Sequence, residues 1–84
     1  MKKTIQGKHR NLVGDRVRKA RLACQPPVTQ DDLAGRLAAR GISMDQTAVS
    51  RIENRTRYVM DYEVAAVAKA LRVPVSSLFG ESNK

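Results

Sequence analysis

Four hydrogen-bonding side chains lie close together near the middle of the chain, beside two apolar residues. The polar residues are Gln46, Thr47, Ser50 and Arg51, and the apolar ones are Val49 and Ile52. If the segment is a helix from about Gln46 to Asn54, the apolar pair forms a narrow packing edge and the rest stays polar. Amide, hydroxyl and guanidinium groups can hydrogen-bond to base edges, and an α-helix fits the DNA major groove. The pattern therefore indicates a helix that packs on one side and reads DNA on the other.

A second helical pattern comes immediately before this segment. Thr29 is a favourable N-cap, and the two aspartates that follow it suit the positive end of a helix dipole. An apolar stripe at helical spacing follows, made by Leu33, Ala34, Leu37 and Ala38. Gly41 is expected to end this helix, and Ser43 or Asp45 to cap the next one. The sequence thus predicts two short helices in tandem between Thr29 and Glu53.

The residues TQDDLA at 29–34, followed by AVSRIEN at 48–54, resemble the Xre/Cro-type helix-turn-helix family of phage and bacterial regulators. The resemblance covers most of the chain, from LVGDRVRKAR at 12–21 to ALRVPVSSLF ending at Phe79. It implies an all-α, compact five-helix, lambda-repressor-like DNA-binding domain. By matching positions, it also implies a set of base-reading residues: Gln46, Thr47, Ala48, Ser50 and Arg51.

Three further roles follow from the same resemblance. Gln30, at the start of the first motif helix, should meet a DNA phosphate through its backbone N–H and brace Gln46 with its side chain. Arg21 and Glu53 should form a structural ion pair that joins the first helix of the chain to the reading helix. Spacing alone would also allow these two to be unrelated surface charges.

One segment departs from the family pattern. Residues 38–44 intervene between Leu37 and Asp45, where the family has a short turn. Either the first motif helix is longer than usual or the turn is a loop. Ile42 and Met44 are expected to pack inward and fix this connection.

The charge balance of the chain is strongly basic. Sixteen Lys and Arg against eight Asp and Glu give a formal net charge of +8 and an isoelectric point near 10.4. Composition alone fits an anionic partner and a merely solubilising surface equally well. Placement favours the first, because Arg51, Arg55 and Arg57 cluster beside the reading helix, and we expect Arg55 and Arg57 to hold DNA phosphates. The resemblance implies a left-handed helix end at the position of Arg55, where the family often has glycine, and Asn54 is expected partly to fill that role.

The remaining pattern divides the chain into a flexible basic arm (1–10), one helical domain (11–80) and a polar tail (81–84). Within the domain, an amphipathic first helix carries a stripe of Val13, Val17, Ala20 and Cys24 and is ended by Pro26 and Pro27. A fourth helix capped by Asp61 should present Tyr62, Val64, Val67, Ala68 and Leu71 to the core. After Pro74, a short turn brings Leu78 and Phe79, which should complete the core or form part of a dimer contact.

Several classes of protein are disfavoured by what the sequence contains. One Cys and one His cannot form a zinc site or an internal disulfide, so we expect no metal and no cofactor. We find no phosphate-binding glycine loop and no nucleophile with its base, so an enzyme is not expected. No apolar run has the roughly 20 residues of a membrane span, and no signal peptide is recognisable, which favours a cytoplasmic protein.

The sequence therefore predicts a transcriptional regulator, most often a repressor, that binds double-stranded DNA. Because a single domain has one short reading surface, we expect a homodimer on an inverted-repeat operator. Two alternatives stay open. Within the same fold, the chain could be the antitoxin of a toxin pair or the controller of a restriction system. From another class, it could be a protein-interaction module that uses the polar helix against a protein.

Overall fold

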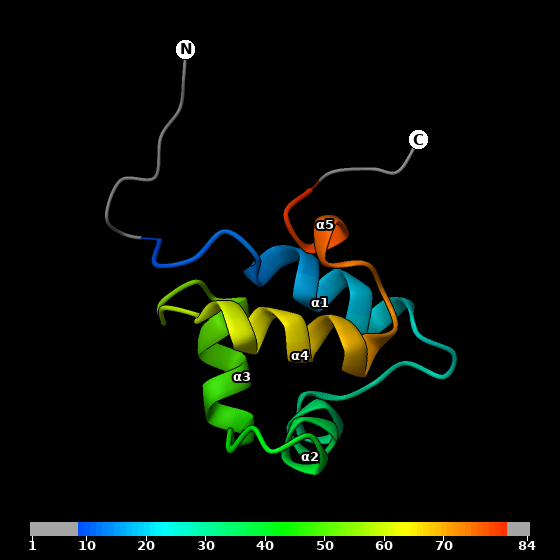
Figure 1. Ribbon diagram of the computed structural model, residues 1–84. Helices are drawn as coiled ribbons and strands as arrows, with labels where there is room; N and C mark the ends of the chain where they lie inside the picture. Colours follow the sequence, from blue (N-terminus) through cyan, green and yellow to red (C-terminus); the bar gives the residue numbers. More distant parts are fainter. Residues whose placement is uncertain (1–8, 81–84) are drawn as a thin grey trace.

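The computed structural model describes residues 9–80, and this range contains five helices (Figure 1). They are α1 (Gly14–Ala23), α2 (Gln30–Ala39), α3 (Gln46–Glu53), α4 (Asp61–Leu71) and α5 (Val75–Leu78). The predicted all-α class is confirmed, and no strand occurs in the described range. None of these helices has the length and apolar character needed to cross a membrane. Most of the predicted basic arm and the whole polar tail lie outside the described residues.

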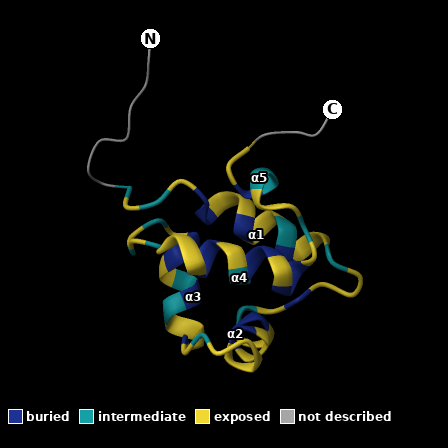
Figure 2. Ribbon diagram, in the orientation of Figure 1, coloured by how far each residue is buried: buried dark blue, intermediate teal, exposed yellow. Residues whose placement is uncertain are grey.

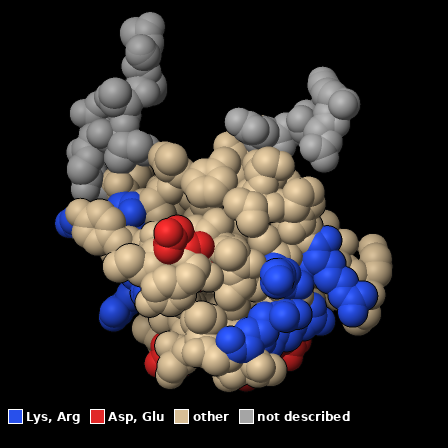
Figure 3. Space-filling view, viewed as in Figure 1, with Lys and Arg blue, Asp and Glu red and all other residues tan. Residues whose placement is uncertain are grey.

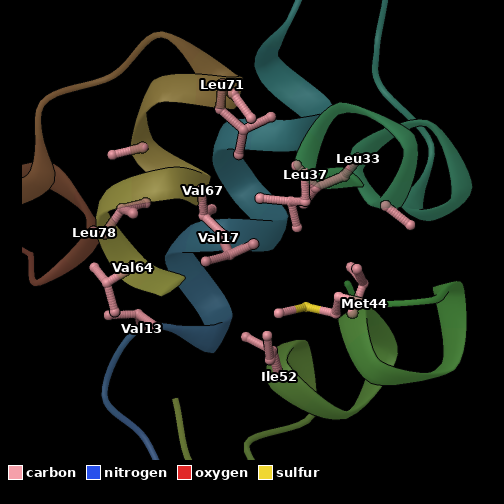
Figure 4. Packing of buried hydrophobic residues seen from close by; sticks show 14 of the residues in the cluster. Val13, Val17, Leu33, Leu37, Met44, Ile52, Val64, Val67, Leu71 and Leu78 are labelled. Atoms are coloured by element: carbon pink, nitrogen blue, oxygen red, sulfur yellow. The ribbon is translucent and has the colours of Figure 1, made fainter. Parts of the chain in front are cut away.

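The core lies where the five helices meet. Figure 4 shows side chains from every helix pointing into one cluster, and Figure 2 shows the buried residues on the inner sides of the helices. The largest fully buried side chains are those of Val17, Leu33, Leu37, Val49, Ile52 and Leu78. Each such side chain contributes roughly 1.5–3 kcal/mol through burial. Cys24 follows the end of α1 and is only partly buried, so it lies at the edge of this core.

The connection between α2 and α3 is a loop. α2 ends at Ala39, and Gly41 adopts a left-handed φ of 84° while the N–H of Ile42 donates to the carbonyl of Leu37 at 2.9 Å. These are the marks of a glycine-terminated helix end. Residues 40–45 then lead to α3, with Met44 buried and Ile42 partly buried, as the sequence predicts.

α4 differs from its predicted pattern at its first turn. Asp61 is the first helical residue and not the cap, which is Met60. Tyr62 is 60% exposed, whereas Glu63 is buried. The helical period explains both, since Glu63 lies four residues before Val67 on the inner face and Tyr62 does not. The assignment of Tyr62 to the apolar face was therefore wrong.

The two large apolar residues at the end of α5, Leu78 and Phe79, lie in different environments. Leu78 is buried within the core, but Phe79 follows the end of α5 and is 48% exposed. Of the two predicted roles, Leu78 takes the core position, and Phe79 remains on the surface. An apolar ring is thus left available beside α5.

Candidate nucleic-acid interface

The start of α3 is fixed by Asp45. Its carboxylate accepts a hydrogen bond from the N–H of Ala48 at 2.9 Å, and its carbonyl accepts from Val49. Of the two predicted caps, Asp45 is therefore the one used, and Ser43 is exposed in the loop. This cap makes Gln46 the first residue of the helix, with its side chain outside the packed turn.

α3 has one packed side and one open side. Its buried residues are Val49, Ile52 and Glu53. The predicted base-reading residues lie on the open side, where Gln46, Thr47 and Arg51 are exposed and Ala48 and Ser50 are half-buried. In Figure 1, α3 stands at the edge of the molecule, so its open side is not covered by another described helix.

Gln46 is held by a chain of hydrogen bonds that begins in the core. Its amide nitrogen donates to the side-chain oxygen of Gln30 at 2.6 Å. The amide nitrogen of Gln30 donates in turn to Oε1 of Glu53 at 3.0 Å. The brace from Gln30 to Gln46 is thus present, and it fixes which way the Gln46 amide faces. With one N–H used, Gln46 still offers one donor and its carbonyl oxygen to the outside.

The ion pair between Arg21 and Glu53 anchors this chain. Nε of Arg21 donates to Oε2 of Glu53 at 2.7 Å, and Nη2 donates to Oε1 at 2.8 Å, so the pair is bidentate. Both residues are buried, at 7% and 6% exposed. The hydrogen bond to Glu53 raises the pKa of Arg21 above its ordinary value, despite burial. The guanidinium makes a third contact, in which Nη1 donates to the carbonyl of Val28 at 2.9 Å. Within the described residues, every buried side-chain nitrogen and oxygen has a hydrogen-bond partner.

α3 ends on an arginine in a left-handed conformation. Arg55 has φ of 64°, its N–H donates to the carbonyl of Ile52, and the N–H of Thr56 donates to the carbonyl of Arg51. Asn54 has φ of −84° and stays in the helical region. The left-handed residue is thus at the position that the family resemblance implies, Arg55. The expectation that Asn54 would partly fill this role was wrong, because the two terminating hydrogen bonds require the left-handed residue to be Arg55 itself.

The two predicted phosphate-binding arginines lie in different environments. Arg55 is half-buried, with Nη2 3.8 Å from a carboxylate oxygen of Asp15, a loose contact. Arg57 is held by Glu63 through two hydrogen bonds of 3.0 and 3.2 Å. Those bonds lower the pKa of Glu63 below its ordinary value and raise that of Arg57. The guanidinium of Arg57 is therefore already paired with a carboxylate, and it is less available to a DNA phosphate than an unpaired arginine would be.

Sequence reasoning missed Arg10, which it placed in the arm. The backbone N–H of Arg10 donates to the carbonyl of Arg55 at 2.9 Å, and Nη1 donates to the hydroxyl of Tyr58 at 2.9 Å. Its guanidinium also lies 5.2 Å from the centre of the Tyr58 ring, within range of a cation–π contact. Arg10, Thr47, Arg51, Thr56 and Tyr58 line one hollow of about 620 Å³ beside the open side of α3. No local pattern indicates this contact, because it joins residues far apart in the sequence.

Asn11 ties this region to α1. Its amide nitrogen donates to the carbonyls of Ile52 (3.1 Å) and Arg57 (2.8 Å). Its side-chain oxygen accepts from the N–H groups of Val13 and Gly14 at the start of α1. One side chain thus joins the beginning of α1 to the end of α3 and the following loop.

Within residues 9–80, no three His, Cys, Asp or Glu side chains are grouped to hold a metal ion. Comparisons with models of protein families, with curated proteins and with solved structures found no match to this chain. The functional inference therefore depends on the residues of the chain itself and on their geometry.

Proposed function

We propose that this chain binds duplex DNA sequence-specifically through the open side of α3 and regulates transcription in the cytoplasm, as a repressor. The observation that carries the proposal is the braced amide of Gln46. A solvent-facing glutamine normally gains little from a fixed orientation, since ordering it costs side-chain entropy. Here two hydrogen bonds through Gln30 connect it to a buried ion pair. Such an arrangement suits a side chain that must present a donor and an acceptor in fixed positions.

The orientation of this amide favours adenine. After donating to Gln30, Gln46 has one N–H and its carbonyl oxygen free. Adenine presents N7 as an acceptor and its N6 amino group as a donor in the major groove, and glutamine pairs with both. Thr47 and Arg51, on the same open side, supply a hydroxyl and a guanidinium for neighbouring bases. We therefore propose that each half-site contains an adenine read by Gln46.

Contacts with the DNA backbone are assigned to arginines in the hollow beside α3 and at the end of α3. Arg10 and Arg51 line this hollow, and Arg57 also lines it but is occupied by Glu63. Arg55 lies at the end of α3, with its guanidinium toward Asp15. The backbone N–H of Gln30, the first residue of α2, adds a donor at the positive end of that helix. These contacts would position the protein without specifying sequence. Arg55 thus keeps the phosphate role predicted from the sequence, and Arg10 takes the one predicted for Arg57.

The proposed assembly is a homodimer on an inverted repeat, with half-sites about one helical turn (10–10.5 bp) apart. Phe79 and Val75 remain 48% and 44% exposed at α5, where we place the dimer contact. A Phe79→Ser variant tests this contact. It should bind duplexes with a shallower dependence on protein concentration, and sedimentation should give one chain per duplex where the wild type gives two.

The proposal is tested by selecting binding sites from random duplexes and titrating the selected site. Replacing the critical adenine with 7-deazaadenine removes N7, and should weaken wild-type binding by the ~1–3 kcal/mol of a lost base contact. Gln46→Ala should bind the adenine and 7-deazaadenine duplexes with equal affinity, and that affinity should match the weakened affinity of the wild type for the 7-deazaadenine duplex. Lys19→Ala, an exposed charge on α1, serves as the control and should keep the preference. If no sequence is enriched and affinity is unchanged by Gln46→Ala, the open side of α3 does not read DNA.

A further inference from the structure

A second hollow lies where the C-terminal ends of three helices come together, and we refer to it as the C-terminal groove. The residues that cap α1, α2 and α4, which are Cys24, Arg40 and Arg72, all line it. Its volume is about 800 Å³. In Figure 1 it corresponds to the side where the α1–α2 connection passes the end of α4, away from α3. None of the residues proposed to contact DNA lines this groove.

The rims of the C-terminal groove are basic. Arg36 and Arg40 lie one helical turn apart at the end of α2, and Lys69 and Arg72 lie at the end of α4. Asp32 is the single acid among the lining residues. Figure 3 shows basic side chains gathered over α2 and the C-terminal end of α4, consistent with this lining. A ligand lying between the two helices would therefore meet cations on both sides.

Helix ends alone do not account for this charge. A helix C-terminus is equivalent to about −0.5 of an elementary charge, so three of them present roughly −1.5. The four cations and one acid have a formal sum of +3 (4 − 1). Arg36 serves the helix end directly, since its Nη1 donates to the carbonyl of Ala70 at 2.9 Å. The positive charge of the lining side chains is thus larger than the negative partial charge of the three helix ends. The groove therefore has a net positive charge that attracts an anionic ligand.

The chemistry of the lining distinguishes a peptide from a second DNA duplex. Helix C-termini present carbonyl acceptors, and a phosphodiester backbone has only acceptors to offer them. A peptide carries N–H donors as well. The groove is also lined by apolar surface, including Pro26, Pro27, Ala39 and Leu71, which a sugar–phosphate backbone would not use. Carboxylates, N–H donors and apolar side chains occur together in an acidic polypeptide segment.

We propose that the C-terminal groove binds an acidic segment of a partner protein. Carboxylates of that segment pair with Arg40, Lys69 and Arg72 on the two rims, and its apolar side chains lie against the prolines of the α1–α2 connection. Because this site and the open side of α3 share no residues, the two can be occupied together. The proposal does not depend on DNA binding by α3.

The test uses the isotope-labelled 84-residue chain and three probes, with binding followed by NMR. The first probe is a twelve-residue acidic peptide made of four Glu-Leu-Ala repeats. The second is the same peptide with Gln in place of each Glu, and the third is a DNA duplex of random sequence. The acidic peptide should shift the backbone amides of Cys24, Gln25 and Val28, which flank the two prolines, and those of 36–41 and 69–73. The amides of 46–54 should stay unchanged. The Gln peptide should bind about tenfold more weakly, since it lacks the ionic contacts. The duplex should not shift the groove amides.

A charge-matched pair of variants completes the experiment. Arg40→Gln combined with Lys69→Gln should weaken the acidic peptide about tenfold, whereas Arg18→Gln with Lys19→Gln, which removes the same charge from α1, should have little effect. All four residues are exposed, and unchanged amide positions for 46–54 would establish that the variants fold. Equal weakening by both variants, peptide shifts confined to α3, or groove shifts produced by the duplex would each overturn the proposal.

Discussion

The side chains of Gln30 and Gln46 are joined by a hydrogen bond of 2.6 Å between the first residues of two consecutive helices. Gln30 therefore acts on DNA recognition through Gln46 as well as through its own position at the start of α2. A double-mutant cycle measures this coupling.

Gln30→Ala should reduce the preference for the selected duplex by less than Gln46→Ala does, because the Gln46 amide is then present but unoriented. The double variant should be no less selective than Gln46→Ala alone. Affinities for selected and scrambled duplexes, measured for wild type and the three variants, give the coupling energy. Strict additivity of the two single effects would mean that the brace has no part in recognition.

A second prediction concerns the buried pair of Arg21 and Glu53. Removing one partner leaves an unpaired buried charge, so Glu53→Ala should lower the free energy of unfolding by about 3–5 kcal/mol. Replacing both, as Arg21→Met with Glu53→Leu, should recover part of that loss, since no buried charge then remains. Urea denaturation followed by circular dichroism gives both values. A double variant less stable than either single variant would contradict this account.

A third prediction concerns pH and the pair of Arg57 and Glu63. The hydrogen bond from Arg57 lowers the pKa of Glu63 below its ordinary value of 4.5 in the folded state. Glu63 therefore contributes stability that is fully present above the unfolded-state pKa and is lost as pH falls through the lower, folded-state pKa. Between about pH 5 and pH 3, stability should fall less steeply in Glu63→Gln than in the wild type.

The control for this pH effect is Asp61→Asn, an exposed carboxylate two residues away in the first turn of α4. Its unfolding is measured over the same pH range, so that loss of a carboxylate from this helical turn can be compared with loss of the Arg57 contact. Identical slopes for Glu63→Gln and the wild type would show that the Arg57 contact does not favour the ionised carboxylate.

A fourth prediction compares two helical glycines. A Cβ at Gly14 would collide with the carbonyl oxygens of Ile52 and Glu53, where α1 meets the end of α3. Gly14→Ala should therefore destabilise the domain by about 1–3 kcal/mol. Gly35 has nothing within 4 Å of the same position, and Gly35→Ala should stabilise it by roughly 0.5–1 kcal/mol. Thermal unfolding of both variants should give melting temperatures on opposite sides of the wild type.

The elements that the sequence predicts well are those set by local chemistry. Thr29 caps α2 as expected, with its hydroxyl accepting from the N–H of Asp32, because capping depends on residues within one turn. The partners of Arg21 and Gln30 were also anticipated, but from a family resemblance and not from spacing. Their separation from Glu53 and Gln46 in the chain carries no signal of its own.

The features that the sequence did not predict arise where loops return to the domain. Glu63 is an acid on a helix facing inward, and only the path of the preceding loop shows that Arg57 meets it. Arg10 reaches Tyr58 across the domain, and its apparent place in a basic arm concealed this. The C-terminal groove likewise requires three helix ends to converge, which no single segment encodes.

The left-handed arginine at the end of α3 yields a last prediction. A non-glycine residue in this conformation costs roughly 1–2 kcal/mol, so Arg55→Gly should raise the free energy of unfolding by about 1 kcal/mol. It should also weaken binding to every duplex and reduce the slope of log affinity against log salt by about one. Arg72, with φ of 61° at the end of α4, is the matched control. Arg72→Gly should give a similar gain in stability with little change in DNA affinity.

At Arg55, folding and binding thus make opposite demands on one backbone position. The geometry that ends α3 favours a residue without a side chain, and the proposed ligand favours a long cation. Selection for thermal stability alone would be expected to replace Arg55 with glycine, and selection for retention on DNA would restore arginine. At this position, one substitution therefore raises stability at the expense of DNA affinity, and the reverse substitution does the opposite.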